Sequence, residues 1–181
     1  MLAPAGKVQG IFAASLGLTR ALKNRGVKAA RFVPFGSGDN GLSVCPEAAF
    51  KQIASGEKFA LLEQIVANYN RLLNTENPDV VIIEGLTSAR FNKDELNADV
   101  CHALDADIIA VIHGWCGNAR AAVTETLRHY GNAGRERVLG NLVINKVVDD
   151  DTAPEEALFP LEITIDNPNA PHAGDTGYDT W

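Results

Sequence analysis

Short apolar runs alternate with longer amphipathic segments along most of this sequence, and this alternation narrows the choice of fold. Residues 79–83 are dominated by β-branched side chains, as expected of a strand that is buried on both faces. The same reasoning predicts strands at residues 2–4, 27–33, 108–112 and 138–144, and helices at 15–23, 59–73, 97–104 and 118–130. The pattern predicts an α/β fold, a three-layer structure in which helices cover both faces of a parallel sheet.

Charge divides the chain into a body and an acidic tail. The net charge is −7, but after Lys146 there are nine acidic residues and no Lys or Arg, so residues 1–146 carry 14 acids against 16 bases. We expect residues 1–150 to form the α/β domain and residues 151–181 an acidic, proline-containing tail, with an edge strand at 158–165 and an extended terminus at 167–181. An acidic tail disfavours nucleic acid as a partner, and a solvated terminus is the simpler interpretation.

Several classes of protein are disfavoured by composition. No apolar run is long enough for a membrane span, and the start lacks the basic segment and apolar core of a secretory signal. Cys45, Cys101 and Cys116 form no CxxC pair, which favours free thiols in a reducing compartment. We therefore expect a cytoplasmic protein that does not associate with membranes.

The opening segment has the layout of a phosphate-binding loop without its usual chemistry. Gly6 and Gly10 are four residues apart and lead into a predicted helix, but the next two residues are Ile11 and Phe12. A working loop places there a Lys that reaches the terminal phosphates and a Ser or Thr that binds Mg²⁺. Lys7 offers a substitute from within the loop, and a solvent-facing lysine is the alternative. The spacing predicts a degenerate nucleotide loop.

Other candidate ligands follow the predicted strands, where the carboxyl ends of a parallel sheet meet. Glu84 ends a buried strand and is a candidate for Mg²⁺. The alternative is that Glu84 caps a helix or accepts a hydrogen bond from the glycine loop. Asn145 is a candidate for contacting a nucleotide base, or for helix capping. His113 and Cys116 have an HxxC spacing that suggests zinc or Cys–His chemistry, but further ligands are not evident, and a packed loop around Trp115 is the alternative.

Several segments resemble one family when taken in order. These are the opening Leu2-Ala-Pro-Ala-Gly6 with Gly10, Ile65-Val-Ala-Asn-Tyr69, Ile82-Ile-Glu-Gly-Leu86, Leu104-Asp-Ala-Asp-Ile-Ile109 and Gly140-Asn-Leu-Val-Ile-Asn-Lys146. Together they resemble the N-terminal domain of the long bacterial phosphate acetyltransferase over roughly residues 1–148. That domain is itself similar to dethiobiotin synthetase, so the resemblance implies a P-loop NTPase-like, dethiobiotin synthetase-like fold.

The resemblance also carries functional expectations and two departures. The family reaction transfers acetyl between coenzyme A and phosphate, and its acetyltransferase domain lies far downstream, so this chain alone is not expected to be catalytic. The N-terminal domain is thought to support oligomer assembly and response to metabolites. This implies a regulatory, homo-oligomeric unit that takes a small-molecule effector and keeps at most a vestigial nucleotide and Mg²⁺ site. Ile11-Phe12 replaces the family's Leu-Thr, and Val33-Pro34 replaces its Lys-Pro.

Two other functions stay open at the level of sequence. One is an ATP-dependent ligase of the dethiobiotin synthetase type, which would need the basic and hydroxyl groups that are absent at Ile11, Phe12 and Val33. The other is a scaffold without a ligand, in which Phe12 and Trp115 would plug the crevice at the sheet edge.

Overall fold

The computed structural model describes residues 1–36, 41–88, 92–114 and 118–144. The predicted tail at 151–181, with its edge strand and extended terminus, lies outside these residues. The described chain folds in the order β1 (Leu2–Pro4), α1 (Ile11–Asn24), β2 (Ala29–Phe32), α2 (Pro46–Ala54), α3 (Lys58–Glu76), β3 (Val80–Ile83), α4 (Lys93–Ala103), β4 (Ile108–His113), α5 (Ala119–Arg128), α6 (Ala133–Glu136) and β5 (Val138–Ile144). The alternation of strands and helices confirms the predicted α/β class.

The strands pair in parallel. β1, β4 and β5 form one ladder and β2 and β3 another. A parallel bridge between Leu2 and Glu84 joins the two ladders, and the Gly85 amide donates to the Leu2 carbonyl at 3.0 Å. The resulting order is β2-β3-β1-β4-β5, so β1 lies directly beside β3.

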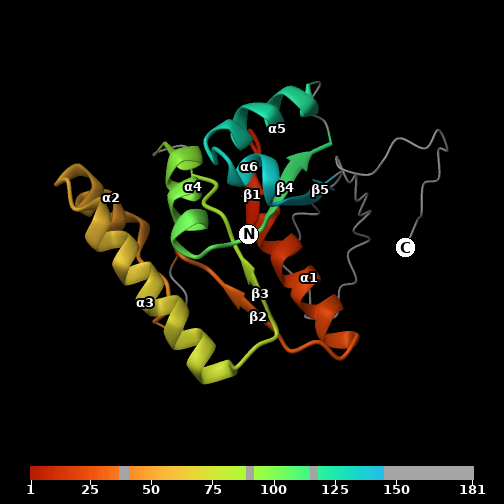
Figure 1. Ribbon diagram of the computed structural model, residues 1–181, viewed down its shortest axis with the longest axis horizontal. Coiled ribbons are helices and arrows are strands. Elements are labelled where there is room, and N and C mark those ends of the chain that lie inside the picture. The colour runs from red at the N-terminus through yellow and green to blue at the C-terminus, as the bar shows by residue number, and fades with distance from the viewer. Residues whose placement is uncertain (37–40, 89–91, 115–117, 145–181) are drawn as a thin grey trace, which may run out of the picture.

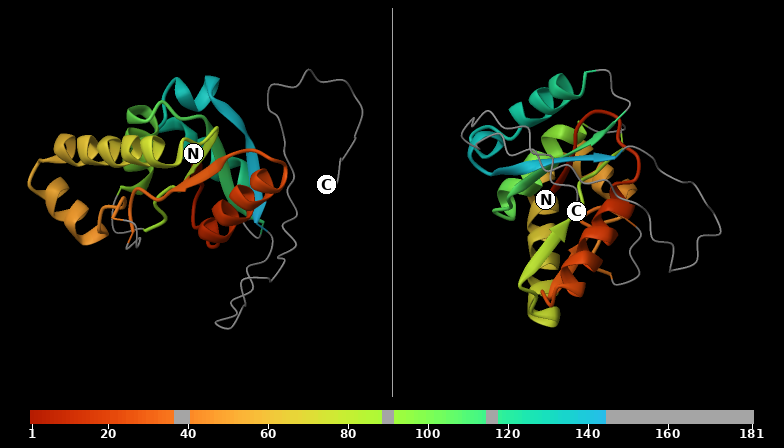
Figure 2. Two further views of the ribbon diagram at one scale, coloured as in Figure 1. Left: turned by 90° about the horizontal axis from the view of Figure 1, so that it is seen from below. Right: turned by 90° about the vertical axis from the view of Figure 1, so that its right-hand side faces the viewer.

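Helices cover both faces of the sheet, as predicted (Figure 1). On one face, α1 places Ile11 and Ala14 against Leu2, Ile82 and Val111. On the other, the buried residues of α3 and α4 pack with alternate strand residues, among them Ala3, Phe32, Ile83, Ile108, Leu61, Ile65, Leu72, Leu96 and Val100. Because successive side chains of a strand point to opposite faces, β1, β3, β4 and β5 contribute to both clusters, while β2 contributes Ala30 and Phe32 to the cluster on the α3 side. Figure 2 shows the same separation of α1 from α3 across the strands.

Some predicted boundaries were wrong. Helix α1 begins at Ile11 rather than at residue 15, because Gly10 adopts φ 84° and allows the chain to turn directly into the helix. Helix α2 was not predicted; it is nine residues long, and Ala49 is its one fully buried residue. Helix α4 begins at Lys93, four residues before the predicted start. Within the described ranges, no helix is long and apolar enough to cross a membrane.

Candidate functional site

The glycine loop connects β1 to α1. Gly6 and Gly10 have φ values of 75° and 84°, which glycine adopts without strain. Val8 and Ile11 are buried in the cluster around Leu2 and anchor the loop to the sheet. The side chain of Lys7 is exposed, and among the described residues no partner is assigned to its ammonium group. The solvent-facing alternative for Lys7 therefore describes its side chain in this structure.

The segment after β3 lies tightly against β1. A Cβ atom on Gly85 would lie 2.4 Å from the Leu2 carbonyl oxygen and 2.7 Å from Pro4 Cδ, so only glycine fits without movement. The Asn97 side chain accepts from the Leu86 amide at 2.7 Å and donates to the Leu86 carbonyl at 3.0 Å. These contacts fix the backbone that carries Glu84 beside the base of the glycine loop.

Glu84 points toward α1 and β2, where its carboxylate already has partners. Its Oε2 atom accepts from Ser15 Oγ at 2.6 Å and from Arg31 Nη1 at 3.0 Å. Ser15 Oγ also lies 2.9 Å from the Phe12 carbonyl, but the shorter contact to a charged acceptor is the stronger one. The Arg31 guanidinium lies over the Phe12 ring, 4.6 Å from its centroid. We call these four residues the Glu84 cluster.

The contacts in the Glu84 cluster correspond to one of the two interpretations of Glu84 that the sequence allowed. Glu84 bonds to the Ser15 side chain of α1 and forms an ion pair with Arg31, and its side chain is 11% exposed. This is close to the structural alternative, although the helix contact is made through a hydroxyl rather than a backbone amide. A role for Glu84 in binding a metal stays a prediction.

Arg31 is the residue that sequence reasoning missed. Position 33, where the resemblance implies a Lys, is Val33 in this chain. Arg31 lies two residues earlier in the chain, and residues two apart in a strand share a face. Its partner Glu84 is 53 positions away in sequence. The alternation of side chains along a strand could have placed Arg31 on the same face as residue 33. No local pattern in the sequence predicts that Arg31 pairs with Glu84.

Other predicted site residues fall apart from this cluster or outside the described residues. Asn145, Cys116 and Trp115 lie outside them, so the structure does not test the predictions that depend on them. Phe12 is 55% exposed, and the expectation that it plugs a crevice together with Trp115 stays a prediction. Within the described ranges, no three His, Cys, Asp or Glu side chains are grouped to hold a metal ion. Cys45 and Cys101 are free thiols, as predicted.

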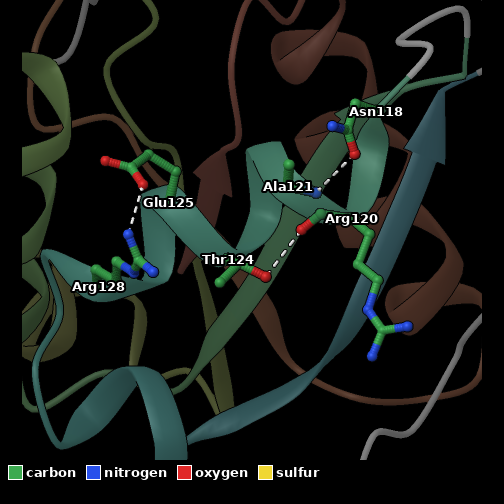
Figure 3. Close-up of a pocket in the computed structure, with 6 residues that line it drawn as sticks. All are labelled: Asn118, Arg120, Ala121, Thr124, Glu125 and Arg128. Atoms are coloured by element: carbon green, nitrogen blue, oxygen red, sulfur yellow. Dashed lines mark hydrogen bonds and ion pairs between the residues drawn. The ribbon is translucent and has the colours of Figure 1, made fainter.

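Two shallow hollows lie away from the Glu84 cluster. One, of about 460 Å³, follows α5, where Asn118 accepts from the Ala121 amide at 3.3 Å and Arg128 pairs with Glu125 at 3.1 Å. Figure 3 shows Arg120 extending away from this ion pair. The other hollow, of about 390 Å³, lies along α3 and reaches Ala103 at the end of α4. Neither hollow includes a residue of the Glu84 cluster among its described lining residues.

The chain is similar in sequence to part of phosphate acetyltransferase from several bacteria. It is 27% identical to the Escherichia coli K12 protein in an alignment of 173 residues, and the match covers 81% of this chain and 24% of that protein. It is 29% identical to the Salmonella typhimurium protein, with the same two coverages, and 29% identical to the Acinetobacter baylyi protein, covering 78% of this chain and 23% of that protein. The chain thus spans about a quarter of the length of these curated relatives. No family model matches it.

A solved structure has a similar fold. It is a DUF1611 family protein from Anabaena variabilis, with a TM-score of 0.52 over 82% of this chain and 46% of that protein. The two sequences are 19% identical, so this likeness concerns the fold alone.

Proposed function

We propose that this chain is a regulatory and assembly unit of the kind found in the N-terminal part of phosphate acetyltransferase, without catalytic activity of its own. The observation that carries the proposal is that the Glu84 carboxylate already has partners within the chain. Its Oε2 atom accepts hydrogen bonds from Arg31 Nη1 at 3.0 Å and from Ser15 Oγ at 2.6 Å. The sequence similarity to a quarter of phosphate acetyltransferase supports the family context. We include a P-loop-type fold in the proposal, because β1, which leads into the glycine loop, lies beside β3.

The described side chains do not match the needs of a Mg²⁺-nucleotide. A magnesium ion at this edge would require Glu84, whose side chain is only 11% exposed, to exchange the half-buried guanidinium of Arg31 for the metal. Ile11 and Phe12 stand where a phosphate-binding loop has Lys and a hydroxyl. Unmatched phosphate oxygens beside apolar groups lose affinity, so the ATP-dependent ligase gains no support from the site.

Calorimetric titration tests the proposal. The purified chain is titrated with ATP and Mg²⁺, then with NADH and with pyruvate as representative metabolites. We expect no heat with ATP and saturable heat with one of the metabolites. Micromolar binding of Mg²⁺-ATP that disappears in Glu84→Ala, and persists in the exposed control Glu76→Ala, would instead establish a nucleotide site and overturn the proposal. Silence with every ligand would remove the effector and leave only the assembly role.

A further inference from the structure

Helix α3 carries a second apolar face beside its fully buried residues, and one member of this face, Leu62, also packs against the edge of the core. Its buried residues, Leu61, Ile65, Asn68 and Leu72, point toward the sheet. Phe59, Leu62 and Val66 lie on the other side, around the hollow that reaches Ala103. The Phe59 side chain is 74% exposed. Figure 1 shows α3 at the outer edge of the molecule, beside α4.

Two exposed charges flank this face without local partners. Glu63 and Arg71 lie four residues before and four residues after Ala67. Residues three and four positions from each of them on α3 are uncharged, so neither has a helical ion pair. Among the described residues, neither Glu63 nor Arg71 is assigned an ion pair with another part of the chain. The helix therefore presents one acid and one base at equal distances from a small residue.

We propose that this face of α3 binds the same face of a second copy of the chain, in antiparallel orientation about a two-fold axis near Ala67. This geometry places Glu63 opposite the partner subunit's Arg71, and the symmetry repeats the pair. The small side chain of Ala67 lets the helices approach closely at the centre. Phe59 and Val66 are covered by the contact. The inference deepens the proposed function, since it assigns a surface to the assembly role.

Self-complementarity favours a second copy over a different partner. A two-fold contact needs opposite charges at equal distances on either side of its centre, and Glu63 and Arg71 meet this condition. An unrelated acidic or basic protein would complement only one of the two charges. The apolar residues beside them supply the area that is removed from water, while the charges set the orientation.

Charge reversal tests the arrangement. In Glu63→Arg both flanking residues are basic, and in Arg71→Glu both are acidic, so each variant repels its own copy. We expect the dimer Kd of each variant to rise about tenfold in sedimentation equilibrium. An equimolar mixture restores both opposite-charge pairs and should form a heterodimer as tight as the wild-type dimer. The double variant E63R/R71E should also recover. Glu76→Arg, a charge reversal about 140° round the same helix, is the matched control.

The outcomes separate this inference from the proposed function. If the wild-type chain self-associates and neither single variant weakens it, the α3 surface is wrong, but the assembly role stands. If the single variants dissociate and their mixture does not recover, the antiparallel pairing is wrong. A wild-type chain that stays monomeric at high concentration would overturn both the inference and the assembly role. Circular dichroism confirms that each variant is folded, which is expected since both side chains are exposed.

Discussion

The positively charged side chain of Arg31 lies beside Glu84, the residue that the sequence suggested as a ligand for Mg²⁺. Its guanidinium lies between the carboxylate of Glu84 and the ring of Phe12. An ion pair of this kind must replace the hydration that both groups lose on folding, and Ser15 supplies a further hydrogen bond to the carboxylate. The Glu84 cluster thus satisfies its own charges within the chain.

This arrangement predicts that loss of Arg31 is costly. In Arg31→Met the stem remains, but Glu84 keeps only Ser15 as an assigned partner at 11% side-chain exposure. We expect the free energy of unfolding to fall by about 1–3 kcal/mol in urea denaturation. Glu84→Gln in the Arg31→Met background should recover part of this loss, since no buried charge is then left unpaired. Strict additivity of the two substitutions would contradict a direct interaction between these side chains.

Cys45 and Cys101 should differ sharply in their reactivity toward alkylating reagents. Burial raises the pKa of the Cys101 thiol, and its Sγ donates to the Ala106 carbonyl at 3.2 Å, whereas Cys45 is exposed. Because the thiolate is the reactive form, a raised pKa leaves less of it at neutral pH. We expect iodoacetamide to label Cys45 first and Cys101 only after unfolding in urea, as followed by peptide mass spectrometry. Equal labelling of both cysteines in the native protein would contradict the buried position of Cys101.

At the scale of elements, the sequence predicted the strands and helices that have a clear local pattern of apolar residues. The apolar run around Ile82 and Ile83 identified β3, because a strand buried on both faces needs apolar residues at every position. Helix α2, only nine residues long, was not predicted. The ion pair of Arg31 with Glu84 depends on the pairing of β2 with β3, which no local pattern contains. Because long-range contacts of this kind cannot be predicted from local patterns, the sequence predicted Glu84 as a candidate ligand but not its ion pair with Arg31.

The junction between β1 and β3 predicts a large effect of adding one methyl group. In Gly85→Ala the new Cβ would lie 2.4 Å from the Leu2 carbonyl oxygen, and neither that backbone nor Pro4 can move freely. We expect a loss of about 2–4 kcal/mol in the free energy of unfolding. Gly56→Ala is the matched control, since its φ is 78° but nothing lies within 4 Å. It should cost about 1 kcal/mol, and an equal loss in both variants would show that crowding at Gly85 is not the cause.

The contact between α3 and α4 should depend on pH. Lys58 Nζ lies 2.8 Å from Glu95 Oε1 and 2.5 Å from Asp99 Oδ2. The bond to Lys58 lowers the pKa of Glu95 below its ordinary value of 4.5, so this pair stabilises the fold above about pH 4.5 and the benefit is lost as the pH falls through the lowered value. Because Glu95 is exposed, we expect at most about 1 kcal/mol.

Urea midpoints of the wild type and Glu95→Gln measure this effect. Their difference should be constant at neutral pH and shrink between about pH 5 and pH 3. In the Lys58→Met background, Glu95→Gln should have little effect at any pH, since the partner that shifts Glu95 has been removed. A difference that persists at about pH 3 would assign the stabilisation to something other than the Glu95 carboxylate.

At the scale of the whole molecule, the Glu84 cluster and the apolar face of α3 lie on different sides of the sheet. The Glu84 cluster lies where α1 meets β2 and β3, while the apolar face of α3 lies beyond the opposite face of the sheet (Figure 1). A second copy bound on α3 would therefore leave the Glu84 cluster uncovered. Between them, β1, β3, β4 and β5 contribute side chains to both core clusters.

Self-association through α3 predicts that thermal stability depends on protein concentration. Binding of a second copy stabilises the folded state by mass action, because unfolded chains do not form the contact. For a chain of 181 residues, each tenfold rise in concentration should increase Tm by about 1–3 °C. Scanning calorimetry of the wild type and Glu63→Arg over a hundredfold concentration range measures this. The Tm of Glu63→Arg should change little, while Glu76→Arg should follow the wild type. A wild-type Tm that is independent of concentration would show that folding and association are not coupled through this helix.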